Sequence, residues 1–122
     1  MPINKENIAT QMRKGIMDYC FLIILAHRRA YPSEIITGLQ QVGLSVKEAT
    51  VYTVLNRLTK EGKVTYQWEE SPSGPPRKYF LITMLGQEYL KATAEVWHEI
   101  STSINKLNNI QGVYHVARAS GK

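Results

Sequence analysis

The side chains that usually carry catalysis are present in this chain but scattered. Its histidines, His27, His98 and His115, lack the short spacing of a metal-ligand pair such as H-x-x-x-H. Glu69 and Glu70 are adjacent, so on a strand they point to opposite faces and cannot act as a carboxylate pair. The sequence contains no glycine-rich phosphate loop. We therefore expect no enzymatic activity, no metal site and no cofactor.

Chemistry of another kind is indicated by one polar helix face. The pattern from Ser45 to Glu61 is helical, and Val51, Leu55 and Leu58 share its inner face. The opposite face and its flanks are short, polar and free of acids, which suits the DNA major groove. For any one of these residues, a solvated surface side chain is the open alternative. We expect Asn56 to bond adenine, Thr50 and Thr53 to meet a thymine methyl group or a phosphate, and Tyr52 and Lys60 to contact backbone phosphates.

The ends of this helix carry their own signals. Ser45-Val-Lys-Glu48 has the S-x-x-E form of a capping box, which predicts the helix start. Gly62 follows the helical pattern, where a left-handed residue is favoured. These signals predict a helix that ends at Glu61.

A hairpin with a basic side is predicted next. Lys63–Trp68 and Lys78–Ile82 are rich in β-branched and aromatic residues and read as paired strands. Ser71–Pro76 between them is turn material, too long for a two-residue hairpin loop, so we expect a projecting tip. Arg77 and Lys78 lie on its return side, where we expect them to follow the minor groove or its phosphates. A helix followed by such a hairpin is the order of a recognition helix and a β-wing.

The remaining elements have to position this helix and hairpin. Apolar residues at steps of three and four predict one long helix from Asn4 to Arg28, whose second half is apolar nearly all round. That half is expected to contact more than one neighbour, one of them this domain's core and another open to a second subunit. A shorter helix is predicted from Pro32 to Val42, ended by Gly43.

A long last helix is predicted from Thr83 to Asn109. Its apolar residues alternate three and four apart, as in a helix that pairs with another helix. The alternative is that this seam covers only its own domain. We expect a dimerisation seam formed by Leu90, Trp97, Ile100, Ile104 and Leu107.

Composition agrees with a cytoplasmic nucleic-acid-binding protein. The 122 residues suit a single domain, and the net charge of +5 favours a phosphate-bearing partner without proving one. The lone Cys20 excludes an internal disulfide and suits a reducing compartment. The apolar run ending at Ala26 is too short to span a bilayer and is interrupted by Asp18, so we expect no membrane association.

Two segments resemble the PadR-type transcriptional regulators. T-V-Y-T-V-L-N-R-L-T-K-E-G-K-V at 50–64 is similar to the Y-x-x-L-x-R-L-x-x-x-G pattern of that family. G-P-P-R-K-Y-F-L-I-T at 74–83 is similar to its G-x-x-R-K-Y-Y-x-L-T strand. The family's Y-G-Y-E-I appears here as Y-P-S-E-I at 31–35, and its R-L-E as R-L-T at 57–59.

The resemblance implies a mainly α fold with a two-stranded wing. It assigns 1–82 to a winged helix-turn-helix domain, 83–110 to a C-terminal dimerisation helix and 111–122 to a flexible tail. The first helix is expected to contribute to the dimer as well.

The function that the resemblance implies is regulation of transcription, as a homodimeric repressor on a palindromic operator. In the subfamily with one terminal helix, a tryptophan stacks with its symmetry mate on flat aromatic ligands, and Trp97 matches that position. Trp97 as a large interface residue alone stays open. The competing function is a winged-helix module that binds protein and has no DNA target, an alternative supported by nearby acids at Glu48, Glu61, Glu69 and Glu70.

Overall fold

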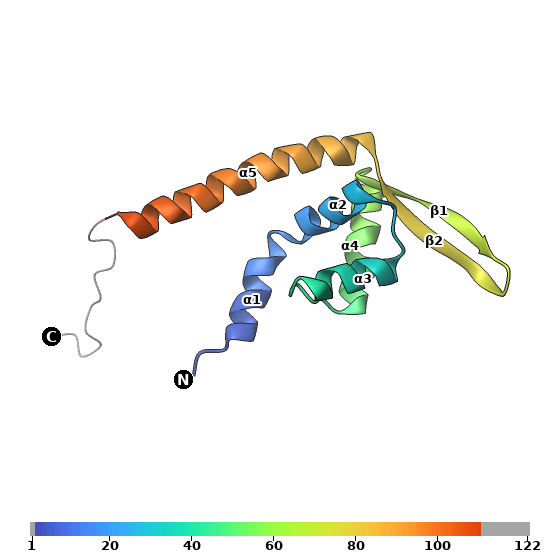
Figure 1. The fold of residues 1–122 in the computed structure, drawn as a ribbon, viewed down its shortest axis with the longest axis horizontal. Coiled ribbons are helices and arrows are strands. Elements are labelled where there is room, and N and C mark those ends of the chain that lie inside the picture. Colours follow the sequence, from blue (N-terminus) through green and yellow to red (C-terminus); the bar gives the residue numbers. More distant parts are fainter. Residues whose placement is uncertain (1, 111–122) are drawn as a thin grey trace. The chain divides into compact units, whose positions relative to one another are not determined.

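A computed structural model describes residues 2–110 of the chain. These residues form two compact units, divided between Lys91 and Ala92 inside the last helix. The predicted tail at 111–122 lies outside the described residues. In chain order (Figure 1), the elements of residues 2–110 are α1 (Lys5–Lys14), α2 (Met17–His27), α3 (Pro32–Gln41), α4 (Glu48–Lys60), β1 (Val64–Ser71), β2 (Gly74–Ile82) and α5 (Met84–Asn109).

The core lies among α2, α3, α4 and the base of the hairpin. Val51, Leu55 and Leu58 are fully buried, which confirms the predicted inner face of α4. Val54 is buried as well and widens that face. The other contributors are apolar residues from each neighbouring element: Met17, Phe21, Leu22, Leu25, Ala30, Ile35, Leu39, Val64 and Phe80.

The prediction of one helix from Asn4 to Arg28 is wrong, because the helix is interrupted at Gly15 and Ile16. Glycine gives up more backbone freedom in a helix than any other residue. No residue of α1 is buried, so packing within this chain does not compel the helix to continue. Arg13 instead donates to the carbonyl oxygens of Gly43 and Ser45, at 3.4 Å each, which ties the end of α1 to the loop after α3.

The loop between α3 and α4 confirms one signal and corrects another. Gly43 is left-handed, with φ of 81°, and the Leu44 N–H donates to the Leu39 carbonyl at 2.8 Å, so α3 ends as predicted. The capping box at Ser45 is wrong, because α4 begins only at Glu48 and has no side-chain cap. Leu44 and Val46 pack against the core, which keeps this segment out of the helix.

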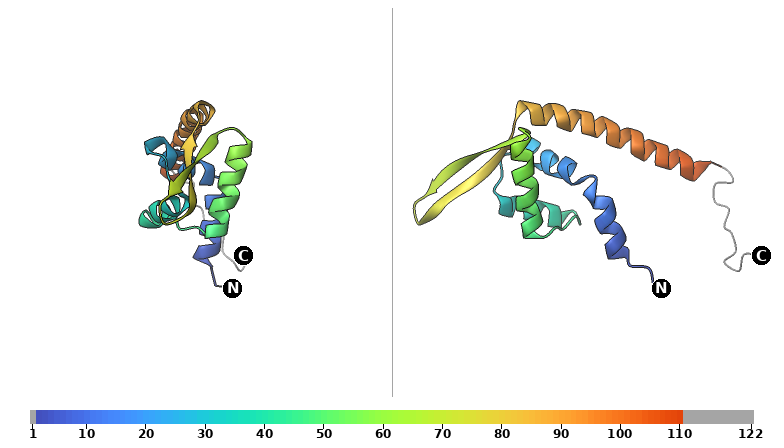
Figure 2. Two further views of the ribbon diagram at one scale, coloured as in Figure 1. Left: turned by 90° about the vertical axis from the view of Figure 1, so that its right-hand side faces the viewer. Right: turned by 180° about the vertical axis from the view of Figure 1, so that it is seen from behind.

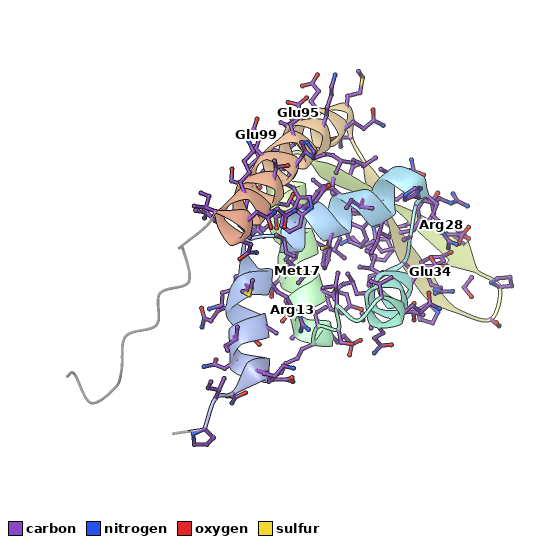
Figure 3. All side chains as sticks on the ribbon, turned by 60° about the vertical axis from the view of Figure 1, so that its left-hand side comes forward. Arg13, Met17, Arg28, Glu34, Glu95 and Glu99 are labelled. Carbon is purple, nitrogen blue, oxygen red and sulfur yellow. The ribbon has the colours of Figure 1, made fainter. Side chains whose placement is uncertain are left out.

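The N-terminus of α3 is capped by a carboxylate side chain, that of Glu34. The Tyr31 N–H donates to Glu34 Oε1 at 3.0 Å, and Glu34 also pairs with Arg28, as Figure 3 shows from the side. The hydrogen bond from Tyr31 and the charge of Arg28 hold the pKa of Glu34 below its ordinary value of 4.5. The folded state therefore favours the ionised form of this carboxyl group.

Replacing Glu34 with glutamine is expected to lower the free energy of unfolding at neutral pH by about 0.5–1 kcal/mol, because this half-exposed cap is screened by water. A depressed pKa stabilises the fold above pH 4.5 and loses that effect as the pH falls through the folded-state pKa. The difference between the two proteins should shrink in acid, measured by urea unfolding across this range. A Glu88→Gln variant is the control, because Glu88 is exposed and makes no ion pair within residues 2–110. A difference that stays constant with pH would contradict the assignment.

The hairpin is longer and its loop shorter than the sequence indicates. Ser71 pairs with Gly74, so Pro72 and Ser73 form a two-residue turn and the expected long loop is wrong. The register shifts between Glu69 and Ser71. This β-bulge leaves Glu70 of β1 opposite both Pro75 and Pro76 of β2. Prolines are tolerated there because each strand of this sheet has a free edge. Figure 2 shows the hairpin extending away from α2, α3 and α4.

The start of α5 is fixed tightly to the base of the hairpin. Thr83 Oγ1 donates to the Gly62 carbonyl at 2.6 Å and accepts from the Gly86 N–H at 3.0 Å. The Thr83 N–H also donates to the Lys63 carbonyl at 3.1 Å. Gly62 is left-handed, with φ of 77°, as predicted, while α4 itself ends at Lys60, one residue before the predicted Glu61. Thr83 is thus the N-terminal cap of α5 and joins three elements at one point.

Helix α5 has the extent that the sequence predicts, apart from its first residue, Thr83, which is the cap. It covers 26 residues, from Met84 to Asn109. Across residues 2–110, no helix is both long enough and apolar enough to cross a membrane.

Candidate nucleic-acid interface

The polar residues predicted on the outer face of α4 all lie on its exposed side. Thr50, Tyr52, Thr53, Asn56 and Lys60 are exposed. Because the inner face is anchored in the core, this outer face is presented on a rigid helix. The structure therefore brings these five residues together, while their contacts with DNA stay a prediction.

The polar groups on this face differ in how far they are already used. Within residues 2–110, the side chains of Thr50, Asn56 and Lys60 make no hydrogen bond or ion pair, so their donors and acceptors are available. Thr53 Oγ1 donates to the Ala49 carbonyl at 3.0 Å. Its hydroxyl proton is thereby used inside the helix, and Thr53 offers a partner its methyl group and oxygen lone pairs.

Arg57 lies beside this face but holds the helix in place. Its guanidinium makes two hydrogen bonds to the carboxylate of Asp18, at 2.8 and 2.5 Å. Arg57 Nη1 also lies 3.7 Å from Oε2 of Glu61, the residue that follows α4. These contacts, led by the hydrogen bond to Asp18, raise the pKa of Arg57. The pair fastens α4 to the first turn of α2, across 39 positions of sequence that carry no local signal for it.

The two basic residues predicted on the wing lie along its arm. The Arg77 guanidinium is 3.8 Å from the centre of the Tyr31 ring, and Arg77 pairs in register with Glu69. Lys78 Nζ is 3.8 Å from the Tyr66 ring and close to Trp68, on the other face of the hairpin. Both cations are thus stacked on aromatic rings, and their role toward phosphates stays a prediction.

The sequence-based prediction of the site did not include an exposed aromatic pair that the structure shows on the wing. Trp68 is 63% exposed and Tyr66 is 39% exposed, and their rings meet edge to face. Val64, Tyr66 and Trp68 are two residues apart and so share one face of β1, a pattern visible in the sequence. The pattern does not show that the strand extends beyond the core, where Tyr66 and Trp68 become exposed.

The predicted seam of α5 divides into two parts. Leu90 packs against the core of the first unit. Trp97, Ile100, Ile104 and Leu107 are between 44% and 55% exposed. Their spacing of three and four residues places them on one side of α5, and Glu95 and Glu99, labelled in Figure 3, lie on another. We call these four the α5 stripe; its part in an interface stays a prediction.

Catalytic features are sparse in the described residues. No group of three or more His, Cys, Asp or Glu side chains there could hold a metal ion. Burial raises the pKa of the Cys20 thiol above its ordinary 9.0, which disfavours the nucleophilic thiolate. A shallow hollow of about 480 Å³ between α2 and α3 is lined by both apolar and polar residues, among them Ile24, His27, Glu34 and Gly38.

Known proteins share this architecture. The profile of the transcriptional regulator PadR-like family matches residues 21–92. The chain is similar to a PadR-like transcription factor from Bacteroides fragilis, at 39% identity over 83% of this chain and 98% of the other, with a TM-score of 0.72. It is similar to a PadR-like transcriptional regulator from Bacillus cereus, at 34% identity over 83% and 99%, with a TM-score of 0.75.

A more distant likeness concerns the fold alone. Bacillus subtilis PadR, solved in complex with operator DNA, is 21% identical over 65% of this chain and 47% of its own length, with a TM-score of 0.60. The winged helix fold and the expectation that the protein is not an enzyme are confirmed by these matches. The chain belongs to the PadR-like family of transcriptional regulators.

Proposed function

We propose that the protein is a sequence-specific DNA-binding repressor that acts in the cytoplasm as a homodimer. The DNA-binding proposal rests on the exposed face of α4, where Thr50, Tyr52, Thr53, Asn56 and Lys60 are polar and are held by a helix whose inner face is buried in the core. An α-helix of this kind fits the major groove, and its short polar side chains are suited to base edges and phosphates. The DNA bound by the Bacillus subtilis relative supports the use of this fold for an operator.

Binding to a selected duplex tests this proposal. The probe is the DNA that the purified chain enriches from a randomised oligonucleotide pool, followed by fluorescence anisotropy at several salt concentrations. We expect sub-micromolar binding that weakens steeply as salt rises, because phosphate contacts release counterions. Failure to enrich any duplex at low salt would overturn the proposal. A protein that co-purifies in that case would favour the protein-interaction module instead.

The homodimer is supported by apolar side chains in the described residues that are about half exposed or more. The α5 stripe is one such group, and Ile8 and Met12 of α1 are 49% and 72% exposed one helical turn apart. We propose that 83–110 pairs two copies, with α1 contributing, and that 1–82 reads DNA. A two-fold pair would place two α4 helices in successive major grooves, about 34 Å apart on a palindromic operator.

Replacing Ile104 with glutamate is expected to convert the dimer to a monomer at micromolar concentration, because it puts a charge inside the apolar seam. DNA affinity should fall by at least about tenfold, since one half-site would be lost. Sedimentation velocity and anisotropy measure the two effects. Asn105→Glu adds the same charge on a neighbouring face of α5 and should leave both unchanged. A dimeric Ile104→Glu protein would contradict the proposed seam.

We further propose that a planar aromatic molecule binds between the Trp97 rings of the two subunits and releases DNA. Indole rings stack readily on flat aromatic compounds, and Trp97 is 44% exposed on the stripe. Such a ligand regulates only if it binds the DNA-free dimer geometry more tightly. Fluorescence titration with planar dyes in a Trp68→Phe background reports on Trp97 alone. An unchanged signal across such dyes would reject this pocket.

A further inference from the structure

The loop between α2 and α3 joins the free edge of the wing. The Ala30 N–H donates to the Phe80 carbonyl at 3.1 Å, and the Phe80 N–H donates to the Ala30 carbonyl at 2.8 Å. This single bridge adds one rung of a third strand to β2. It lies at the base of the hairpin, where Phe80 is buried, so by itself it does not hold the outer part of the arm.

Tyr31, the next residue, reaches further along the arm. Its ring meets the Tyr79 ring edge to face, with centres 6.1 Å apart. The Arg77 guanidinium lies 3.8 Å from the centre of the Tyr31 ring. The Tyr31 hydroxyl donates to the carboxylate of Glu69. Glu69 and Arg77 are the last regular pair before the register shift, so Tyr31 contacts the arm at the limit of its regular part.

Neighbouring contacts extend this arrangement. The Tyr79 hydroxyl donates to Gln67 Oε1 at 2.7 Å, and the Arg29 guanidinium lies 4.2 Å from the centre of the Tyr79 ring. The hydrogen bond to Glu69 also raises the pKa of Tyr31 above its ordinary value. We call this group the wing clamp: Arg29, Tyr31, Gln67, Glu69, Arg77 and Tyr79.

A two-stranded ribbon needs such a clamp if it is to keep one direction. Isolated hairpins are marginally stable in water, and two-stranded ribbons twist more strongly than larger sheets. Beyond the core, the face of this hairpin that carries Tyr66 and Trp68 is exposed. The wing clamp lies on the opposite face and links the arm to the first residue before α3.

We propose that Tyr31 is a positioning residue for DNA recognition, which holds the arm through Glu69 and Arg77 at the angle from which the wing reaches DNA. This inference depends on the proposed function. Tyr31 does not itself contact DNA, because Arg77 and Tyr79 already cover its ring and Glu69 occupies its hydroxyl. Preorganisation of this kind increases affinity by lowering the entropy lost on binding.

The test uses the full chain and the duplex enriched by the wild-type protein. Tyr31→Phe keeps the ring and removes only the donor to Glu69. We expect affinity to fall roughly three- to tenfold, while the slope of log affinity against log salt is unchanged, because no phosphate contact is lost. Lys60→Ala is the contrast, since loss of a phosphate contact lowers that slope by about one. Circular dichroism confirms that each variant is folded at the assay temperature.

Two further measurements separate positioning from general weakening. Glu69→Ala and the Tyr31→Phe/Glu69→Ala double variant form a cycle, and the double variant should bind no more weakly than Glu69→Ala alone. Hydrogen exchange over residues 64–82 should be faster in Tyr31→Phe. Tyr66→Phe removes a hydroxyl from the other face of the arm, where it has no hydrogen-bond partner among residues 2–110, and should leave exchange unchanged.

The possible results are distinguishable. Wild-type affinity and exchange in Tyr31→Phe would overturn the inference and leave the proposed function standing. A salt slope lowered by about one would also overturn it, because Tyr31 would then be a DNA contact. Additive effects in the cycle would show that Tyr31 does not act through Glu69. Failure of the wild-type chain to enrich any duplex would overturn the proposed function and this inference together.

Discussion

Replacement of Gly86 by alanine is expected to lower the free energy of unfolding by about 2–4 kcal/mol, and the melting temperature by roughly 10 °C. A Cβ atom at this position would lie 2.0 Å from the Lys63 carbonyl oxygen and 2.7 Å from Ile82 Cγ1. The Lys63 carbonyl cannot move easily, because it is backbone and accepts the Thr83 N–H. The higher helix propensity of alanine, about 1 kcal/mol, offsets only part of this cost. Thermal and urea unfolding measure the effect.

Gly15→Ala is the matched control, because it makes the same change where space is open. Nothing lies within 4 Å of a Cβ at Gly15, and its φ of −78° is one that alanine adopts freely. This variant should be unchanged or more stable by about 0.4–1 kcal/mol. Equal stability of the Gly86 and Gly15 variants would show that α5 does not begin against the hairpin as described.

Thr53→Glu is expected to weaken DNA binding by at least about a hundredfold while the fold stays intact. Thr53 is exposed at the middle of the outer face of α4, so a carboxylate there would oppose phosphates and base acceptors. The loss should be largest at low salt, where repulsion is screened least. Anisotropy with the selected duplex measures affinity, and circular dichroism checks that helix content is retained.

Thr37→Glu gives this experiment a close control on α3. Thr37 is also exposed, and its Oγ1 donates to the Ser33 carbonyl at 3.0 Å, the same distance as the bond from Thr53 to Ala49. Charge, helix context and the lost hydrogen bond are therefore equal in the two variants. We expect Thr37→Glu to bind within about threefold of the wild type. An equal loss in both would show that net charge, rather than the α4 face, governs binding.

The parts of this fold that the sequence predicts are those with a regular local period. The inner face of α4 follows from apolar residues three and four apart, and α5 follows from the same spacing sustained over many turns. Gly43 and Gly62 were identified because a left-handed residue after a helix favours glycine. For the candidate interface, the same periodicity was enough to name the exposed residues of α4.

The errors arose where contacts distant in sequence override a local signal. Ser45 resembles a cap, but burial of Val46 delays the helix to Glu48. The turn of the hairpin depends on a register shift that composition does not show. Arg57 and Asp18 are 39 positions apart, and Tyr31 and Glu69 are 38 apart, so neither pairing has a periodic pattern. These pairings determine how rigidly the interface is held.

The single residue between β2 and α5 has a mechanical consequence. Thr83 separates Ile82 from Met84, and its hydrogen bonds reach Gly62 after α4, Lys63 before β1 and Gly86 in the first turn of α5. A one-residue connection of this kind leaves little freedom for α5 to move separately from β2. Because these hydrogen bonds involve Gly62 and Lys63, a force applied to the first turn of α5 would be transmitted to the backbone that connects α4 to β1, and so to the base of the hairpin.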